Sequence, residues 1–504
     1  MPNPLHDALL APHIDRDTPF LILGDGTVLT HRGFLSTAAR YAHALVSAGL
    51  KPGDRLAVQV DKSPEALGVY AACIMAGVVF LPLNTGYTPH EVCNFVENSG
   101  AAMMLGRSDA RDELRHHCDR IAVRYETLEA DGSGSFPDLA VGLPGHFDPC
   151  DRSDDDLAAL LYSSGTTGLS KGVMLSQRNL LSNARVLKDY WRFTAEDVLI
   201  HALPIFHGNG LFVAANVMLL AGGAMIFLPR FDLNAVLEAL PQATSLMGVP
   251  TFYTRLLDHP GFTRERCANM RLFITGSRPM LPETHRAFEE RTGHRIIQRY
   301  GTTETNVNTS NPYEGERRAG TVGLPLPGVE LRITDPDSGD TLPVGEAGMI
   351  EVRGANVFQG YWRMPEKTAE ELRPDGFFLT GDLGVQGDDG YVTIVGRGKD
   401  LIISGGFNVY PVDVEQVLDE QPGVLESAVI GAPHPDLGES VVAVLVPEAG
   451  AKLDVLDIEA EIGGKLARFK QPRHYVIVDE LPRNSMGKVQ KKLLRQTYED
   501  VFRG

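Results

Sequence analysis

Helical and strand-like patterns alternate along the chain before Gly301, and this alternation restricts the possible folds more than any other feature. Between residues 33 and 83, a helical pattern, an apolar strand, a second helix and a second strand follow one another. The same rhythm returns between 198 and 250. Helices that alternate with strands predict a mostly parallel sheet with helices on its faces. We therefore expect two α/β subdomains in this part of the chain.

The pattern changes at about Gly323, where short strands and turns replace the alternation. Beyond 411 the chain again mixes helices and strands, over about a hundred residues, which is the size of a separate small domain. A chain of 504 residues is too long for one hydrophobic core. The expected fold class is α/β. A large N-terminal domain of α/β subdomains plus a small β-rich piece (1–398) precedes a small mobile α+β C-terminal domain (399–504).

Composition and charge exclude several classes of protein. The net charge of −18 argues against nucleic acid or an anionic membrane as a partner. Five scattered cysteines without a CxxC pair indicate free thiols in a reducing compartment. The longest apolar stretch, 66–83, is interrupted by Gly77 and Pro82, so it predicts a buried helix that runs into a strand. With no signal-peptide pattern at the N-terminus, the sequence predicts a cytoplasmic protein.

A stretch rich in glycine, serine and threonine, "YSSGTTGLSKG" (162–172), lies between two apolar segments. Most such stretches are solvated linkers, but a linker is seldom flanked by buried strands. A strand, a Gly-rich turn and a second strand present backbone N–H groups to a phosphate. The hydroxyls of Ser163, Ser164, Thr166 and Thr167 would add donors, and Lys171 a positive charge. The pattern GxxxxGK[ST] is absent, so this is a phosphate loop of another kind.

Four later stretches carry further candidates for chemistry. "QRYGTTETN" holds the lone carboxylate Glu304, and "GFFLTGDLG" places Asp382 after an apolar strand. "GRGKDLIISGGFNVYP" stands at the expected domain boundary, and "LPRNSMGKVQKKLLR" carries Lys488. Each has a structural alternative: an N-cap partner, a turn residue, a simple turn or a solvated lysine. In this order and at this spacing, these alternatives fail together.

This set of motifs closely resembles that of the acyl-adenylate-forming superfamily, which contains acyl-CoA synthetases, firefly luciferase and peptide-synthetase adenylation domains. The resemblance covers nearly the whole chain. It implies that a carboxylate reacts with ATP to give acyl-AMP and pyrophosphate, and that coenzyme A then displaces AMP. ATP, Mg²⁺ and coenzyme A are therefore the implied cofactors and cosubstrates.

The resemblance also assigns roles to individual residues. Lys488 would stabilise the charge that develops during adenylation, and Glu304 would bind Mg²⁺ with a hydroxyl nearby, such as that of Thr166. Tyr300 would stack on adenine, Asp382 would bind the ribose, and Arg397 would contact ribose or phosphate. The complete ATP site implied in this way comprises Ser163, Ser164, Gly165, Thr166, Thr167, Gly168, Lys171, Gly276, Ser277, Arg299, Tyr300, Gly301, Thr302, Thr303, Asp382 and Arg397.

Two half-reactions at one site require the C-terminal domain to turn, because Lys488 must leave before a thiol enters. Lys399 occupies the hinge position of the superfamily. Gly405 and Gly406 would let pantetheine approach the backbone closely, although a simple turn is the alternative. Lys470 would meet the phosphates of free coenzyme A.

The acid pocket in this superfamily is built largely from the stretches corresponding to 201–212, 248–257 and 273–280. Arg255 interrupts an apolar helical stretch there, and a guanidinium in a pocket is expensive unless it meets an anion. These segments closely resemble malonyl-CoA synthetases, so Arg255 would hold the second carboxylate of a dicarboxylate unless it faces solvent. Arg286 is a weaker candidate. His207 and Ser277 would form pocket walls, although a structural role for His207 is the alternative.

The sequence departs from the pattern of malonyl-CoA synthetases at three places. These departures make a substituted or slightly longer dicarboxylate an option in addition to malonate. Gly208–Asn209 replaces bulkier residues, Thr302 replaces a methionine, and Arg278 replaces a small residue. The first two changes would enlarge the pocket and make it more polar, and Arg278 would add a cation. Methylmalonate is one acid of this kind.

Three other functions stay open on the sequence alone. The chain could be a CoA ligase for another short carboxylic or dicarboxylic acid, load a carrier-protein thiol in place of free coenzyme A, or act as a degenerate nucleotide-binding module. The presence of Lys488, Glu304, Asp382 and Lys171 argues against degeneracy. The sequence is compatible with a monomer or a homodimer.

Overall fold

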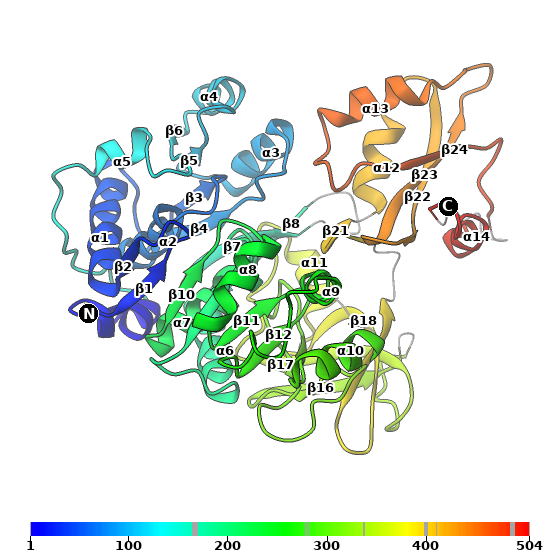
Figure 1. Cartoon of the computed structure of the whole chain (residues 1–504). Coiled ribbons are helices and arrows are strands. Elements are labelled where there is room, and N and C mark those ends of the chain that lie inside the picture. Colours follow the sequence, from blue (N-terminus) through cyan, green and yellow to red (C-terminus); the bar gives the residue numbers. More distant parts are fainter. Residues whose placement is uncertain are drawn as a thin grey trace. The chain divides into compact units, whose positions relative to one another are not determined.

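The computed structural model describes residues 2–163, 170–277, 280, 282–335, 338–397, 402–409, 411–483 and 489–502, with the backbone alone at 111, 395–397, 408, 412, 416 and 492. The α/β class and the order of a large and a small domain are confirmed (Figure 1). The chain forms two compact units. Unit 1 comprises 1–85, 96–161 and 172–396, and unit 2 comprises 86–95, 162–171 and 397–504. The expected boundary at 398/399 stays a prediction.

Two largely parallel sheets form the N-terminal part, as the alternating sequence pattern predicts. One has the strand order β6-β5-β3-β4-β7-β8 and the other β15-β14-β13-β12-β11-β9-β10-β1-β2. The first contains β3 (Arg55–Val58), β4 (Val79–Pro82), β5 (Met103–Gly106), β6 (Arg124–Thr127), β7 (Leu157–Ser163) and β8 (Lys171–Ser176). The second contains β1 (Pro19–Ile22), β2 (Val28–Thr30), β9 (Val198–His201), β10 (Ala224–Phe227), β11 (Ser245–Gly248), β12 (Leu272–Thr275), β13 (Ile297–Tyr300), β14 (Thr309–Ser310) and β15 (Leu324–Pro325).

Helices follow the strands of both sheets (Figure 1). Unit 1 and its adjoining segments contain the short turns η1 (His6–Leu10), η2 (Ala11–His13), η3 (Asn209–Ala215) and η4 (Leu240–Gln242). The α-helices are α1 (His31–Ser47), α2 (Pro64–Ala76), α3 (Pro89–Ser99), α4 (Arg111–Arg120), α5 (Ser135–Leu139), α6 (Gln177–Tyr190), α7 (Asn216–Ala221), α8 (Leu233–Ala239), α9 (Pro250–Asp258), α10 (Pro282–Thr292) and α11 (Pro365–Glu371).

Local sequence signals define where several of these helices begin and end. The Ser63 side chain accepts a hydrogen bond from the N–H of Ala66 at the start of α2, with Pro64 at the first helical position. Gly77 ends α2 in the left-handed region, with φ +68. The apolar stretch 66–83 is therefore a buried helix that runs into β4, as expected. Within the described residues, no helix is both long and apolar enough to span a membrane.

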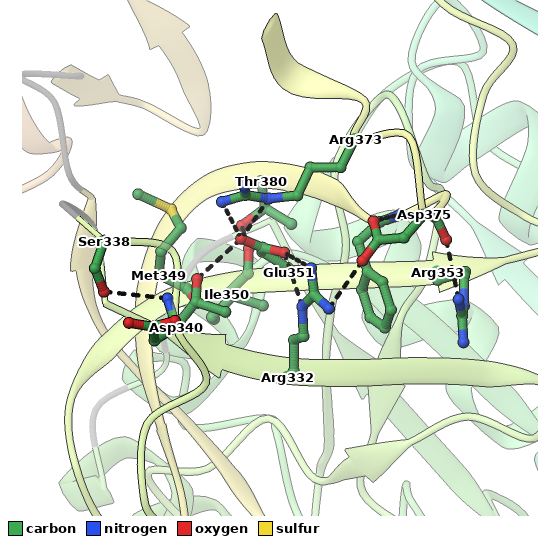
Figure 2. Close-up of polar contacts among 12 residues, drawn as sticks. Arg332, Ser338, Asp340, Met349, Ile350, Glu351, Arg353, Arg373, Asp375 and Thr380 are labelled. Carbon is green, nitrogen blue, oxygen red and sulfur yellow. Dashed lines mark hydrogen bonds and ion pairs between the residues drawn. The ribbon is translucent and has the colours of Figure 1, made fainter. Parts of the chain in front are cut away.

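A small antiparallel sheet follows, with the order β16-β17-β18-β19, as the change of texture after Gly323 predicts. Its strands are β16 (Val329–Thr334), β17 (Gly348–Gly354), β18 (Phe378–Gln386) and β19 (Val392–Arg397). The buried carboxylate of Glu351 lies at its centre, and it accepts hydrogen bonds from the guanidinium groups of Arg332 and Arg373 and from the Thr334 hydroxyl (Figure 2).

The C-terminal segment is an α+β unit with its own core. The strands are β20 (Ile402–Ser404), β21 (Phe407–Val409), β22 (Val424–His434), β23 (Gly438–Pro447) and β24 (His474–Ile477). The helices are α12 (Pro411–Asp419), α13 (Val455–Gly463) and α14 (Lys491–Thr497). Apolar side chains cover both faces of the long β22–β23 hairpin, since one cluster forms against α12 and α13 and another against α14.

Candidate active site

Tyr300 and Asp382, expected at the adenosine of ATP, contact each other. The phenol of Tyr300 donates a hydrogen bond to Asp382 Oδ2 at 2.7 Å. Tyr300 ends the parallel strand β13, and parallel sheets commonly place ligands beyond the carboxyl ends of their strands. One oxygen of Asp382 is thus held by Tyr300, which fixes the carboxylate. Both side chains stay predictions as ATP contacts.

A β-bulge in the "LTGD" stretch positions Asp382. Met349 of β17 pairs with Leu383, and Glu351 pairs with Leu379, so β18 contains extra residues between these two pairs. Gly381 lies in this bulge with φ +76, which strongly favours glycine. The Thr380 hydroxyl bonds to the carbonyl of Ile350 at 2.8 Å and accepts the N–H of Asp382 at 3.1 Å. The bulge therefore determines where the Asp382 carboxylate points.

Glu304, the expected Mg²⁺ ligand, follows β13 and contacts a buried tyrosine. The Tyr361 hydroxyl lies 3.2 Å from Glu304 Oε1 and 2.6 Å from Glu371 Oε2. The backbone carbonyl of Glu304 accepts the N–H of Phe358 at 2.8 Å. The residues 304 and 358–361 are therefore tied together by backbone and side chain.

Arg299 is a buried cation, and no described residue pairs with its guanidinium. Only 5% of the residue is exposed, and its Nε has no hydrogen-bond partner. Burial lowers the pKa of Arg299 to about 10, and no nearby carboxylate opposes that shift. The guanidinium lies against the backbone of Gly276, where a Cβ atom would come within 2.4 Å of Arg299 Cζ. A side chain at 276 would therefore have to displace the guanidinium of Arg299.

His207 lies in the loop between β9 and η3, in the segment expected to line the acid pocket. The residue is exposed to solvent, yet the surrounding protein desolvates its ring and lowers the pKa to about 4. The imidazole is therefore neutral at pH 7. A neutral ring can contribute one hydrogen-bond donor and one acceptor to a ligand, but no positive charge.

Hydrogen bonds of the half-buried Lys62 and the buried His201 hold the two ends of this loop. Lys62 Nζ donates to the carbonyls of His201 at 2.7 Å and Leu228 at 2.6 Å, and it lies 2.8 Å from His201 Nδ1. His201 Nε2 lies 2.8 Å from the carbonyl of Gly210. Desolvation first, and then the neighbouring ammonium, lower the pKa of His201 to about 3. A neutral His201 that donates from Nε2 and accepts at Nδ1 satisfies both contacts.

The structure places Arg255 differently from the expectation that it points into an enclosed pocket. Arg255 lies on the exposed side of α9, while Tyr253 and Leu256 of the same helix are buried. Arg286 of α10 is also exposed and forms an ion pair with Glu283 at 2.8 Å. Neither side chain has the desolvated position that was the argument for an anion contact. Ser277, with φ +70, is the last described residue before the gap that contains Arg278.

Several residues of the predicted site are not among the residues that the structure describes. These are Ser164, Gly165, Thr166, Thr167, Gly168, Arg278, Lys399 and Lys488. Ser163 ends β7, and Lys171 begins β8 with 6% exposure. The backbone of Arg397 ends β19, but its side chain is not described. Gly301, Thr302 and Thr303 connect β13 to Glu304, and the hydroxyls of Thr302 and Thr305 lie 3.1 Å apart.

In unit 2, Gly405 and Gly406 form the turn between β20 and β21, with φ +58 and +90. Lys470 is not available to coenzyme A phosphates in this structure. It is 3% exposed, and its ammonium lies 3.1 Å from Glu91 Oε1 and 3.4 Å from Asp413 Oδ2. Burial alone would lower the pKa of Lys470, but Tyr87 and the two carboxylates raise it above its usual value. The contact of Lys470 with coenzyme A stays a prediction, and it would require these ion pairs to open.

The residues around Glu304 fit a Mg²⁺ ion that is bound together with nucleotide. No three His, Cys, Asp or Glu side chains among the described residues gather to hold a metal by themselves. Mg²⁺ needs no such group, since it keeps several waters and is bound by one or two carboxylates plus substrate phosphates. Glu304, with one oxygen near Tyr361, can supply one carboxylate.

Sequence reasoning missed Tyr361, Lys62, His201 and Asp413. Tyr361 lies in "GYW" and Lys62 in "VDKSP", and neither stretch has a spacing of residues that indicates chemistry. The partners of these residues are far away in the chain. The isolated Lys62 after an apolar strand is the one weak signal, because a charge there needs a partner.

Comparisons with known proteins cover nearly the whole chain. The model of the AMP-binding enzyme family matches residues 12–362, and that of the AMP-binding enzyme C-terminal domain matches 413–488. The chain is 34% identical to a feruloyl-CoA synthase of an Amycolatopsis species over 500 residues, which is 98% of each protein. The crystal structure of ATP-bound MatB from Rhodopseudomonas palustris is 52% identical, with a TM-score of 0.79 over 99% of both chains. A malonyl-CoA ligase solved with methylmalonyl-CoA and AMP is 36% identical, with a TM-score of 0.81 over 96% of this chain and 100% of that one.

Proposed function

The chain belongs to the AMP-binding enzyme family, and from that premise we propose that it activates a short dicarboxylic acid, malonate or a substituted malonate such as methylmalonate. The family membership agrees with the resemblance seen in the motifs, and makes the chain an AMP-forming acid–thiol ligase that uses ATP, Mg²⁺ and coenzyme A. One carboxylate of the acid attacks the α-phosphorus of ATP and releases pyrophosphate. The thiol of coenzyme A then attacks the acyl carbon and releases AMP.

The single observation that carries the proposal is the buried Arg299, whose guanidinium has no partner among the described residues. An uncompensated buried charge costs several kcal/mol, so proteins seldom keep one without a partner. A guanidinium offers two parallel N–H donors to a carboxylate. The only carboxylate of a monocarboxylic acid is engaged in the reaction, so such an acid has none left for Arg299. The second carboxylate of a dicarboxylic acid would pair with Arg299.

The motifs placed Arg299 in the expected ATP site, but its burial makes it a better candidate for this anchor than the exposed Arg255. Arg299 immediately precedes Tyr300, which is expected at the nucleotide. Its guanidinium lies against Gly276, in the segment 273–280 that is expected to line the acid pocket. A site close to the α-phosphate is where a three-carbon diacid would need its second anchor. Arg255 stays a second candidate, and Arg278 and Arg286 are weaker ones.

The relatives support this acid class without deciding it. The malonyl-CoA ligase carries methylmalonyl-CoA as its product, whereas the feruloyl-CoA synthase, at a similar identity, is named for an aromatic monocarboxylic acid. The buried guanidinium of Arg299 favours a dicarboxylic acid, because ferulate has no second carboxylate to pair with it. Gly208 has no side chain, and a Cβ atom added there would already touch Phe212 and Asn306, so a bulkier residue would fill the space beside them. This supports the option of a substituted malonate.

An acid panel tests the proposal. The purified protein is supplied with ATP, MgCl₂ and malonate, methylmalonate, succinate, butyrate or ferulate, and AMP release is measured with and without coenzyme A. We expect the highest kcat/KM for malonate or methylmalonate, and thioester formation with free coenzyme A. A preference for butyrate or ferulate would contradict the diacid proposal, and AMP release without thioester would favour a carrier thiol.

The variant Arg299→Leu identifies the anchor. Loss of a shielded ion pair from one side costs on the order of 2–5 kcal/mol, which corresponds to a decrease of about 30- to 5,000-fold in kcat/KM for malonate. The ratio of malonate to butyrate should fall steeply, because butyrate leaves Arg299 unpaired in the original protein. Arg255→Leu is the matched control. If Arg255→Leu lowers that ratio and Arg299→Leu does not, Arg255 is the anchor.

A further inference from the structure

Tyr361 is one of the most buried tyrosines of the chain, and its hydroxyl lies between two carboxylates. It is 2% exposed, with the hydroxyl 2.6 Å from Glu371 Oε2 and 3.2 Å from Glu304 Oε1. A phenol has one proton, so the two carboxylates share a single donor. The phenol can therefore orient either carboxylate, and the surrounding contacts decide which one depends on it.

The rest of the environment fixes the tyrosine in place. Its backbone N–H donates to the Thr368 hydroxyl at 2.9 Å, and its ring packs at 4.8 Å against Phe358. Phe358 in turn donates its N–H to the carbonyl of Glu304 at 2.8 Å. The phenol oxygen therefore has a defined position relative to the Glu304 carboxylate.

The second carboxylate is compensated independently. Glu371 lies on α11 and forms an ion pair with Lys367 at 3.0 Å, one turn earlier on the same helix. Lys367 also pairs with Glu370 at 2.7 Å. Glu371 therefore does not depend on the Tyr361 proton alone, and the phenol can hold Glu304 without leaving Glu371 uncompensated.

From these contacts we propose that Tyr361 is a positioning residue for nucleotide-bound Mg²⁺, which acts by holding Glu304 Oε1 so that the other carboxylate oxygen faces the ion. Metal-ligating carboxylates are themselves commonly hydrogen-bonded, and loss of such a partner typically costs 10- to 100-fold in metal affinity or activity. The inference rests on the proposed function only through the ATP and Mg²⁺ that the family uses. It does not depend on which acid is activated.

The test measures Mg²⁺ affinity without any acid or coenzyme A. An α,β-methylene analogue of ATP is titrated into the protein by calorimetry at increasing MgCl₂ concentrations. We expect Tyr361→Phe to raise the Mg²⁺ concentration for half-maximal tight binding about 10- to 100-fold, with binding restored at high MgCl₂. Tyr70→Phe is the control, since it removes a buried hydroxyl that bonds to Asn216 at 3.1 Å. It should lower the Tm and leave the Mg²⁺ profile in place.

Glu304→Gln completes the design, because Tyr361 is inferred to act through Glu304. Adding Tyr361→Phe to Glu304→Gln should change the Mg²⁺ profile little further. Glu371→Gln, which keeps the Tyr361–Glu304 contact, should bind Mg²⁺ nearly as the unchanged protein does, and it tests the inference even if Tyr361→Phe does not fold. An unshifted Mg²⁺ profile in Tyr361→Phe, or an equal shift in Glu371→Gln, would overturn the inference. Absence of nucleotide binding in the unchanged protein would instead contradict the proposed function.

Discussion

At the scale of single residues, the motifs gave candidate side chains for the chemistry, but not what those side chains contact in the fold. Tyr300 and Asp382 were expected at different parts of ATP, and the structure adds the hydrogen bond between them. Arg255 and Lys470 were chosen for their charge and sequence context. One is exposed and the other is buried between two carboxylates, because the orientation of a side chain depends on tertiary packing that one sequence does not display.

Lys62 lies outside every motif, yet it holds the loop after β9 that is expected to line the acid pocket. Replacement of Lys62 by Met removes the donor for the carbonyls of His201 and Leu228. Each buried carbonyl left without a donor costs about 1–3 kcal/mol. We expect a lower Tm and a higher KM for the acid, because His201 holds the carbonyl of Gly210 at the end of the pocket loop.

The KM for ATP is the internal comparison for Lys62→Met and should change little. Lys51→Met, at an exposed lysine, is the control variant and should match the unchanged protein in all three measurements. Equal increases in the KM of acid and ATP would mean that Lys62 supports the fold in general and not the pocket loop.

At the scale of elements, sequence periodicity predicted most of the parallel α/β strands, but not their pairing. The strand β1 lies in the same sheet as β10, more than two hundred residues later, and only the shared core reveals this. The bulge in β18 was also invisible, since "LTGD" is compatible with a continuous strand followed by a turn. Register is set by the partner strand, which the local sequence does not contain.

Glu351 of β17 stabilises the sheet that contains this bulge (Figure 2). Its carboxylate is fully buried and accepts from Arg332 and Arg373. Glu351→Leu would leave both guanidinium groups without that partner. Because both arginines are partly exposed and Arg332 keeps Asp375, the loss of stability should stay below the about 3–5 kcal/mol of a fully buried pair. Since Ile350 and Thr380 hold Asp382, the KM for ATP should rise as well. Urea unfolding and ATP kinetics measure the two effects.

Glu330→Leu is the matched control for Glu351, because Glu330 forms an exposed pair with Arg353 on the same sheet. Exposed pairs contribute little, so neither the urea midpoint nor the KM for ATP should change. If Glu351→Leu unfolds at the same urea concentration as Glu330→Leu, the arginines of the buried cluster are stabilised by water or by Asp375 instead.

At the scale of the whole molecule, the division into a large and a small part was predictable, since texture and length both change along the chain. The membership of residues 86–95 in the same compact unit as the C-terminal segment was not. Lys470 and Glu91 lie 379 residues apart and form an ion pair. No local pattern marks a contact of this separation, and each residue alone is an ordinary surface type.

The cluster of Lys470, Glu91, Asp413 and Tyr87 makes the stability of unit 2 depend on pH. Burial raises the pKa of Asp413 to about 6, opposed by Lys470 and assisted by Glu91, and its Oδ1 has no hydrogen-bond partner. The folded form therefore takes up this proton at a higher pH than the unfolded chain, whose carboxyl has a pKa near 4. Between these two values the folded state binds more protons, so this group destabilises the fold increasingly as pH rises from about 4 to 6.

Asp413→Asn should remove that pH dependence, because the amide resembles the protonated carboxyl and leaves Lys470 paired with Glu91. Two pH units of pKa shift correspond to roughly 3 kcal/mol, so the variant should gain up to about that much over the unchanged protein at pH 7.5 and about a third of it at pH 4.5. Urea unfolding at both pH values, followed by hydrogen exchange in unit 2, measures the difference. Asp479→Asn, at an exposed position, controls for the loss of one negative charge. An equal gain in unfolding free energy at both pH values would mean that Asp413 is not the titrating group. The gain should shrink in acid only if Asp413 is ionised in the folded state at pH 7.5 and protonated there at pH 4.5, since the amide resembles the protonated form.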